Sequence, residues 1–200
     1  MMNFNEDYIL ENDFVKLTPL EPKHVSELLE ISNEPDIWTY SFIKGNGLEN
    51  LTDYIESTVQ ARKSKKEYPF LVFDKIQNKV AGCTRYYDII PSLQSLRVGY
   101  TWYGKDFRGT KLNKSCKYLL FDFAFNHLNF ERIGLGAYAE NKISIAAMES
   151  VGCTKEGIFR NFLPTKNGRT DAVLYSILKN EWEMHEKTAL YRKIESTFNQ

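Results

Sequence analysis

Hydrophobic and polar residues alternate along several short stretches of the chain, and this two-residue period is typical of half-buried β-strands. The first such stretch covers residues 14–20 and ends in Pro19-Leu20. Turns at Gln77-Asn78 and at Lys166-Asn167-Gly168 separate later pairs of strands. The further predicted strands are 68–74, 79–90, 96–104, 132–140, 155–163 and 170–178.

Other stretches carry the helical period instead. The clearest covers 113–128, where positions 116, 119, 120, 123, 124 and 127 form one apolar face if His127 is counted on it. Further helices are predicted from about residue 22, over 50–66, between Asn141 and Gly152, and over about 180–197 around Trp182. The order of elements predicts an α+β fold, a three-layer arrangement of a mixed, largely antiparallel sheet with helices on both faces. No repeat or linker divides residues 1–200, which predicts one domain with its core over about 12–182.

Composition narrows the class of protein. A chain of 200 residues with 42% hydrophobic, 14% aromatic and 26% charged residues is not disordered. Its apolar runs fall short of the ~18 residues of a membrane span, and its acidic N-terminus is unlike a signal peptide. Cys83, Cys116 and Cys153 lack C-x-x-C spacing, so we expect reduced, buried thiols in a cytoplasmic protein with no metal site and no membrane partner.

Charge is balanced overall but uneven along the chain. The formal net charge is zero, which argues against direct binding of nucleic acid. Residues 1–56 carry 12 acidic and 3 basic side chains, a net of −9, and residues 57–200 carry the compensating +9. This asymmetry is explained either by two surfaces that meet oppositely charged ligands or by chance sorting over one folded surface.

Two glycine patterns imitate nucleotide sites. Gly99-x-x-x-x-Gly104-Lys105 resembles a P-loop, but Asp106 stands where a hydroxyl must hold magnesium. Gly134-x-Gly136-x-x-Ala139 lacks the preceding strand of a dinucleotide fingerprint. His24, His127 and His185 lie far apart and predict packing or surface roles.

The segment 105–117 has an unusual excess of positive charge. Lys105, Arg108, Lys111, Lys114 and Lys117 face only one acidic residue, although a helix N-terminus disfavours cations. A bound anion explains this pattern, because free backbone N–H groups, the helix dipole and lysines together form a phosphate site. A solvated lysine face on a surface helix explains it equally well.

The sequence motifs in and around this segment resemble those of GNAT-fold N-acetyltransferases of the RimJ/RimL-like branch. The resemblance is carried by Trp102-Tyr103-Gly104-x-x-Phe107-Arg108-Gly109-Thr110-x-Leu112-Asn113, Phe121-x-x-Ala124-Phe125-x-x-Leu128-x-x-Glu131-Arg132-Ile133, Asn141-x-x-Ser144-x-x-Ala147-Met148-Glu149, Glu156-Gly157-x-x-Arg160, Gly168-x-x-Asp171, and Tyr175-Ser176-Ile177-Leu178 with Glu181-Trp182. It covers about residues 12–182 in order. It implies a sheet splayed at an acetyl-CoA site between the strands 96–104 and 132–140.

Several cofactor residues follow from this resemblance. The backbone of Tyr100, Thr101 and Trp102 is expected to polarise the thioester carbonyl. The pyrophosphate is expected on the amides of about 109–114, and Asn141 on the pantetheine arm, although Asn141 also suits a helix cap. Lys111 and Asn113 depart from the family's small residues, and Lys111 is expected to add charge to the phosphate. The predicted cradle comprises Arg108, Gly109, Thr110, Lys111, Leu112, Asn113 and Lys114.

The sequence signals for catalytic residues are less specific than those for the cofactor site. Ser144 stands where related enzymes place a hydroxyl near the thiol and is the candidate acid, with Tyr138 in reserve; an ordinary first-turn serine is the alternative. Arg97 occupies a position where many relatives carry a glutamate base, which leaves Glu131, Asp88 and Asp171 as bases through water. Aromatic residues of the acceptor pocket, or of the core, are Trp38, Tyr40 and Tyr86, together with Phe42, Tyr87 and Phe162.

The resemblance therefore implies an acetyl-CoA-dependent N-acetyltransferase acting on a protein N-terminus or a small amine, with no metal and with a homodimer as one possible assembly. The acidic N-terminal segment favours a cationic amine. The alternatives are another acyl-CoA transferase, such as a succinyltransferase or a polyamine- or antibiotic-modifying enzyme, and a CoA-binding module without turnover.

Overall fold

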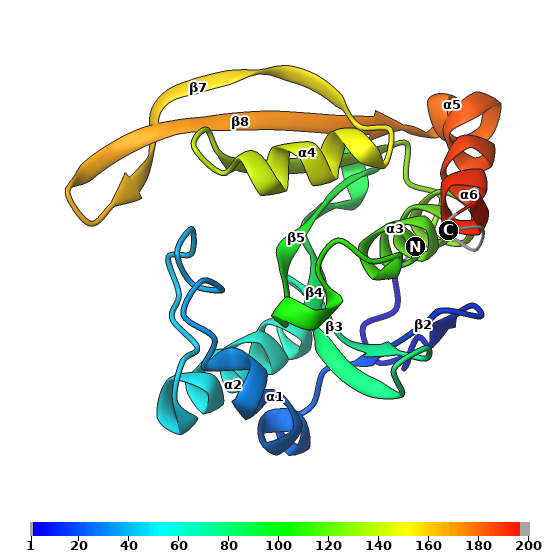
Figure 1. The fold of residues 1–200 in the computed structure, drawn as a ribbon. Helices are drawn as coiled ribbons and strands as arrows, with labels where there is room; N and C mark the ends of the chain where they lie inside the picture. Colours follow the sequence, from blue (N-terminus) through cyan, green and yellow to red (C-terminus); the bar gives the residue numbers. More distant parts are fainter. Residues whose placement is uncertain (1, 197–200) are drawn as a thin grey trace.

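The computed structural model describes residues 2–196, and within them one mixed sheet runs through the molecule in the order β1-β2-β3-β4-β5-β6-β8-β7 (Figure 1). Neighbouring strands are antiparallel except β5 and β6, which are parallel. The strands are β1 (Leu10–Glu11), β2 (Val15–Pro19), β3 (Tyr68–Asp74), β4 (Lys79–Ile90), β5 (Ser95–Tyr103), β6 (Arg132–Tyr138), β7 (Thr154–Thr165) and β8 (Gly168–Leu178). The predicted α+β fold is confirmed, and the two-residue β1 is the strand that the alternation pattern missed.

Helices cover both faces of this sheet. The main ones are α1 (Val25–Ser32), α2 (Leu48–Lys63), α3 (Leu112–Asp122), α4 (Lys142–Ser150) and α6 (Lys187–Ser196). Short turns are η1 (Pro22–His24), η2 (Pro91–Leu93), η3 (Lys105–Phe107) and α5 (Lys179–Glu181), and single π-helical turns are η4 (Phe123–His127) and η5 (Trp182–Glu186). The C-terminal helix was predicted to extend to residue 197, which lies outside the described residues.

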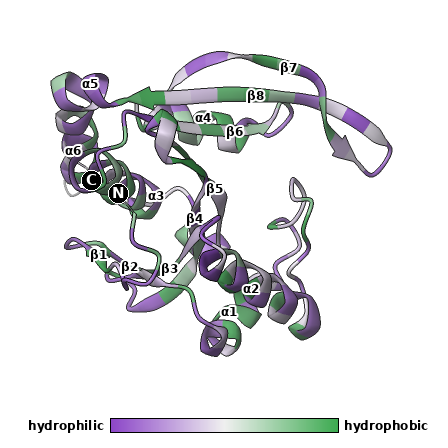
Figure 2. Ribbon diagram, turned by 180° about the vertical axis from the view of Figure 1, so that it is seen from behind, coloured by the Kyte–Doolittle hydropathy of each residue, from purple (hydrophilic) through white to green (hydrophobic). Residues whose placement is uncertain are grey.

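Two hydrophobic cores lie on opposite faces of the sheet. On one face, α1 and α2 pack over a core that includes Leu28, Ile55 and Leu71. On the other, α3, α4 and α6 share a larger core with β2–β8, including Leu120, Met148 and Leu190. Figure 2 shows β8 changing from hydrophobic residues near α5 to hydrophilic ones near its hairpin turn, where the β7–β8 ribbon extends past the core.

The helix predicted over 113–128 forms, but its buried face differs from the prediction. His127 is exposed, whereas Phe121 and Phe125 are fully buried. The reason is tertiary: Trp182 packs against this side of the helix, with ring centres 5.8 Å from Phe121 and 6.3 Å from Phe125. The π-helical turn η4 also adds a residue to the last turn, which rotates the residues that follow it.

The three cysteines are free and buried, as predicted. Burial raises the pKa of the Cys116 and Cys153 thiols to about 12, so both are protonated at neutral pH.

Candidate functional site

The sheet opens between β5 and β6. These strands pair at only three positions, Ser95 with Arg132, Leu96 with Ile133 and Arg97 with Gly134. Beyond Arg97, β5 carries one residue more than β4 opposite it, and Tyr100 adopts a left-handed φ of 48°. Such a bulge bends a strand and ends its pairing, so the edges of β5 and β6 beyond this point are not bonded to each other.

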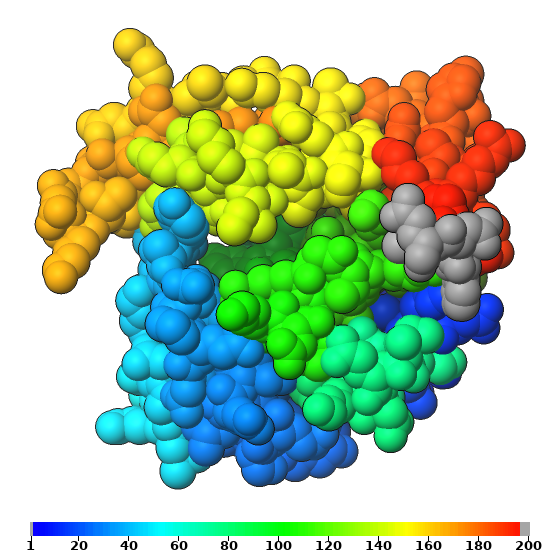
Figure 3. Space-filling model, in the orientation of Figure 1, coloured from blue at the N-terminus to red at the C-terminus, as the bar shows by residue number. Residues whose placement is uncertain are grey.

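The opening between β5 and β6, which we call the gap, lies in a hollow of the surface. Figure 3 shows this hollow between the green segment around residues 100–115 and the yellow-green α4. The start of α3 lies at one end of the gap, since η3 and a short loop join β5 directly to α3. The gap is therefore bounded by the facing edges of β5 and β6, which lack partners on that side, and by a helix N-terminus.

The loop before α3 presents backbone donors. Gly109 has a left-handed φ of 74°, and within residues 2–196 the N–H groups of Gly109 and Thr110 donate to no protein acceptor. Thr110 Oγ1 accepts a hydrogen bond from Leu112 N at 3.2 Å and donates to Phe107 O at 2.8 Å, which fixes the loop. The first-turn N–H groups of α3 add to this set, so the site suits an anion.

The charged side chains of the loop have other partners. Arg108 Nε donates to Tyr103 O at 2.9 Å, and its Nη2 lies 3.5 Å from Glu34 Oε2. The buried Nζ of Lys111 lies 4.7 Å from the ring centre of Phe14. Lys111 was expected to add its charge to a phosphate, but in the structure its amine lies against Phe14. The donors that the loop presents to an anion are backbone N–H groups.

The predicted acceptor residues separate into core and surface. Tyr86 is fully buried and donates its hydroxyl hydrogen to Leu120 O at 2.6 Å, so placing it in an acceptor pocket is wrong. Trp38 is also buried, with its Nε1 donating to Ser32 O at 2.8 Å. Trp38 nevertheless lines a cavity beside the α1–α2 connection, whereas Tyr86 was misplaced because aromatic residues of the core and of a pocket look alike in a sequence.

Tyr40 and Phe42 fit an acceptor surface better. Both are exposed and lie against Tyr138, with ring centres 5.7 and 5.6 Å away. Tyr87 instead packs edge-on against Tyr100 at 5.0 Å, and Phe162 pairs with Phe159 at 5.2 Å on the β7–β8 hairpin.

The two candidate acids differ in their surroundings. The Tyr138 hydroxyl donates to Pro164 O at 3.0 Å, and partial burial raises its pKa. Asn141 caps α4 by accepting a hydrogen bond from Ser144 N at 3.0 Å, which confirms the predicted cap. The half-buried Ser144 hydroxyl has no protein partner among residues 2–196. Ser144 therefore has a hydroxyl available to a ligand, whereas Tyr138 holds the hairpin.

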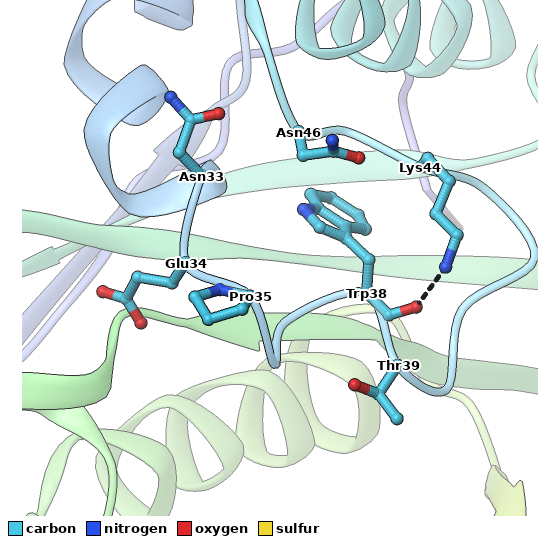
Figure 4. A pocket seen from close by; sticks show the side chains of 7 residues that line it. All are labelled: Asn33, Glu34, Pro35, Trp38, Thr39, Lys44 and Asn46. Atoms are coloured by element: carbon cyan, nitrogen blue, oxygen red, sulfur yellow. Dashed lines mark hydrogen bonds between the residues drawn. The ribbon is translucent and has the colours of Figure 1, made fainter.

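A cavity of about 300 Å³ lies beside the α1–α2 connection. It is lined by Asn33, Glu34, Pro35, Trp38, Thr39, Lys44 and Asn46 (Figure 4). Lys44 Nζ donates to Trp38 O at 2.7 Å across it, and Glu34 joins it to the loop before α3. The connection that carries Tyr40 and Phe42 is therefore linked through Glu34 to the segment that leads into α3.

Comparison with known proteins identifies the family. Residues 15–154 match the family described as "Acetyltransferase (GNAT) domain". The chain belongs to this GNAT acetyltransferase family. It is an acetyltransferase. Its sheet is splayed between β5 and β6, as the resemblance predicted.

Relatives of this acetyltransferase match over nearly their whole length. The chain is 26% identical to "Putative ribosomal N-acetyltransferase YdaF" of Bacillus subtilis (strain 168), over 86% of this chain and 95% of that protein. A GCN5-related N-acetyltransferase from Brucella melitensis has a TM-score of 0.86 and 27% identity, covering 94% of this chain and 86% of that one. The fold also matches the Microcin C7 self immunity acetyltransferase MccE in complex with acetyl-CoA and AMP, with a TM-score of 0.74 and 21% identity over 84% and 93% of the chains.

None of the three carboxylates predicted as bases of this acetyltransferase is placed in the gap without another partner. Glu131 lies 3.8 Å from Lys179 at the paired end of β6, away from the gap. Asp171 accepts a hydrogen bond from Asn161 N at 2.7 Å in the β7–β8 hairpin, and Asp88 lies 3.8 Å from Arg97. Arg97 itself lies across β6, where a Cβ on Gly136 would meet its Nη2 at 2.8 Å. Asp88 is therefore paired with Arg97, the residue of β5 at which the gap begins.

One buried group of this acetyltransferase was missed by sequence reasoning. Lys117, on α3, is only 6% exposed, and its Nζ donates to Thr101 Oγ1 at 3.0 Å. Burial lowers its pKa to about 8. The excess of lysines over 105–117 was the signal, but a helical lysine is usually exposed and gave no reason to single out position 117.

No group of three or more His, Cys, Asp or Glu side chains in the described part of the chain is arranged to hold a metal ion. Among the same residues, no helix is long and apolar enough to cross a membrane.

Proposed function

We propose that this acetyltransferase transfers the acetyl group of acetyl-CoA to a primary amine, at a protein N-terminus or on a small molecule, by direct attack of the amine. The observation that carries the proposal is the gap between β5 and β6 that ends at the N-terminus of α3. An elongated ligand with a phosphate group at one end fits this combination of unpaired strand edges and N–H donors. The name of MccE, which shares the fold, states a complex with acetyl-CoA.

Acetyl-CoA would lie with its pyrophosphate on the backbone of 109–114 and its pantetheine arm along Tyr100, Thr101 and Trp102. An N–H group of β5 near the bulge would polarise the thioester carbonyl, because a fixed backbone dipole stabilises the oxyanion as it forms. Asn141 and Ser144 would contact the arm from α4. Charged side chains of Arg108, Lys111 and Lys114 would contribute through the potential around the loop rather than through the direct contacts first expected.

The acceptor would enter from the side of Tyr40, Phe42 and Tyr138. It must arrive as a free amine, and an α-amine with a pKa near ~8 loses its proton more readily than a lysine side chain near ~10.4. A site without an evident base therefore favours an α-amine. The name of one relative, "Putative ribosomal N-acetyltransferase YdaF", is compatible with a protein N-terminus as acceptor.

The test is release of CoA from acetyl-CoA across a panel of amines, with the product identified by mass. Peptides with free N-termini, the same peptides blocked at the N-terminus, and a polyamine would be compared. The proposal predicts acceptor-dependent CoA release and a product heavier by one acetyl group, with blocked peptides inactive. Release with succinyl-CoA but not acetyl-CoA, or no turnover with any amine, would overturn it.

A further inference from the structure

Lys117 is a buried amine at the centre of the molecule. It extends from α3 to β5, where its Nζ donates to Thr101 Oγ1 at 3.0 Å. Thr101 Oγ1 in turn lies 2.8 Å from Thr84 Oγ1 of β4, so one hydrogen-bonded chain joins α3 to two strands. Lys117 has three donors, and among residues 2–196 this hydroxyl is its one hydrogen-bond partner. A buried amine with so few partners is costly, which indicates a role other than packing.

No carboxylate compensates the charge of Lys117. The described salt bridges do not include it, and the titratable groups that act on it are the protonated thiols of Cys116 on the same helix and Cys153 before β7. The hydroxyl of Tyr103 on β5 faces Cys116, and the charges of Glu181 and Glu186 act on Cys153. Desolvation therefore dominates, and the lowered pKa of about 8 leaves both charge states populated near neutral pH.

Lys117 is bonded to a residue of β5 that borders the gap. Thr101 lies on the part of β5 beyond Arg97, its last residue paired with β6. Lys117 is five residues into α3, about 7 Å along the helix from the N–H groups that suit a phosphate. A pantetheine arm that starts at those groups and follows β5 into the gap passes Thr101. Because Lys117 Nζ is bonded to Thr101 Oγ1, the amine would lie beside the arm where the arm passes Thr101.

We propose that the Lys117 ammonium donates its proton to the sulfur of CoA as the thioester bond breaks. This inference rests on the proposed function. The amine nitrogen attacks the carbonyl carbon, the C–N bond forms, and the C–S bond breaks with its electron pair going to sulfur. Sulfur takes a proton from Lys117 Nζ, and the proton lost by the acceptor nitrogen passes to solvent. Solvent then returns a proton to Lys117, so protons balance over the cycle.

Lys117 suits this step better than the hydroxyls predicted from the sequence. A general acid is most effective when its pKa lies near the working pH and near that of the group it protonates, which for a thiol is ~8.5. The hydroxyl of Tyr138 is engaged with Pro164 O, and its pKa is raised. Ser144 has a free hydroxyl, but an alcohol is a far weaker acid than the thiol it would have to protonate, so Ser144 fits binding of the arm.

The kinetic test compares Lys117→Arg with Lys117→Met. Arginine keeps the positive charge but cannot give up a proton near neutral pH, and methionine keeps the length without charge. We expect kcat to fall about a hundredfold or more in both variants, with the Kd for acetyl-CoA changed by less than about threefold. The exposed Lys79→Met is the matched control and should behave as wild type. Wild-type kcat in Lys117→Arg would overturn the proton transfer.

A second measurement needs no turnover and no variant. The charge state of Lys117 would be followed by NMR of labelled lysine in the wild-type protein, alone, with CoA and with desulfo-CoA. If the sulfur lies beside Lys117, CoA should raise the apparent pKa of this amine as the thiolate forms, and desulfo-CoA should not. Equal effects of the two ligands would overturn the inference even if Lys117 variants fail to fold. Absence of binding by both ligands and by acetyl-CoA would instead contradict the proposed function.

Discussion

Glu34 shows how a single side chain connects the two sides of the site. Both of its carboxylate oxygens accept hydrogen bonds from Lys105 N, at 2.8 and 3.1 Å, and it pairs with Arg108. Glu34 belongs to the acidic segment 1–56, which was expected to favour a cationic acceptor. In the structure its partners are instead on the segment that leads into α3, where acetyl-CoA is proposed to bind.

Replacing Glu34 by alanine should therefore impair use of the donor rather than of the acceptor. We expect the KM for acetyl-CoA to rise severalfold, because a charge-assisted hydrogen bond to the loop, of about 1.5–3 kcal/mol, is lost. Steady-state kinetics with each substrate varied in turn would measure this. The neighbouring exposed Asp36→Asn is the control. A rise confined to the acceptor KM would support the cationic-acceptor hypothesis instead.

At the scale of single elements, the first residues of α4 have a structural role in the fold and a proposed role in binding acetyl-CoA. Asn141 caps the helix through Ser144 N, and the same amide is predicted to contact the pantetheine arm. The cap was readable from the sequence because asparagine followed by a helical period is a local signal. A contact with a ligand leaves no such local signal.

Two substitutions at Asn141 separate these roles. Alanine should lower the free energy of unfolding by about 1 kcal/mol, whereas serine, which also caps helices, should change it little. If the amide holds the arm, both variants should weaken acetyl-CoA binding to a similar degree. Chemical unfolding and calorimetric titration of the two proteins would measure these effects. Full affinity in the serine variant would show that Asn141 is only a cap.

Helix α2 is held on the sheet by a buried polar contact. The Tyr54 hydroxyl accepts hydrogen bonds from Arg85 Nη2 at 2.8 Å and from Trp102 Nε1 at 3.2 Å, and Arg85 also pairs with Glu67. Sequence reasoning did not identify this contact, because its members come from α2, β4 and β5 and no spacing relates them.

Tyr54→Phe should lower the free energy of unfolding by about 1–3 kcal/mol, since it leaves two buried donors without their acceptor. Tyr191→Phe, which removes a hydroxyl from an exposed ring, should have little effect. Urea unfolding of both variants would measure the difference. Equal stability of Tyr54→Phe and wild type would show that water replaces the lost acceptor.

For the whole molecule, the sequence predicted the fold more fully than the site. Strand bounds such as 68–74 and 79–90 match the structure because alternation and turn residues are local signals. Tyr86 was misplaced because β4 is buried on both faces over much of its length, which removes the distinction between its two sides. Lys117 was missed because its burial depends on packing between α3 and β5, which only the tertiary structure sets.

The central claim is that the gap, with the N-terminus of α3 at its end, binds acetyl-CoA. Calorimetric titration of acetyl-CoA into wild type, Thr110→Asn and Thr110→Asp tests it most directly. Both replacements can accept the hydrogen bond from Leu112 N, and asparagine can also donate to Phe107 O as Thr110 does, whereas aspartate adds a negative charge and loses that donor. We predict a Kd on the order of micromolar for wild type and asparagine, and binding at least about tenfold weaker for aspartate, because its carboxylate repels the pyrophosphate. Equal affinity of the asparagine and aspartate variants, or no binding to wild type, would contradict the account.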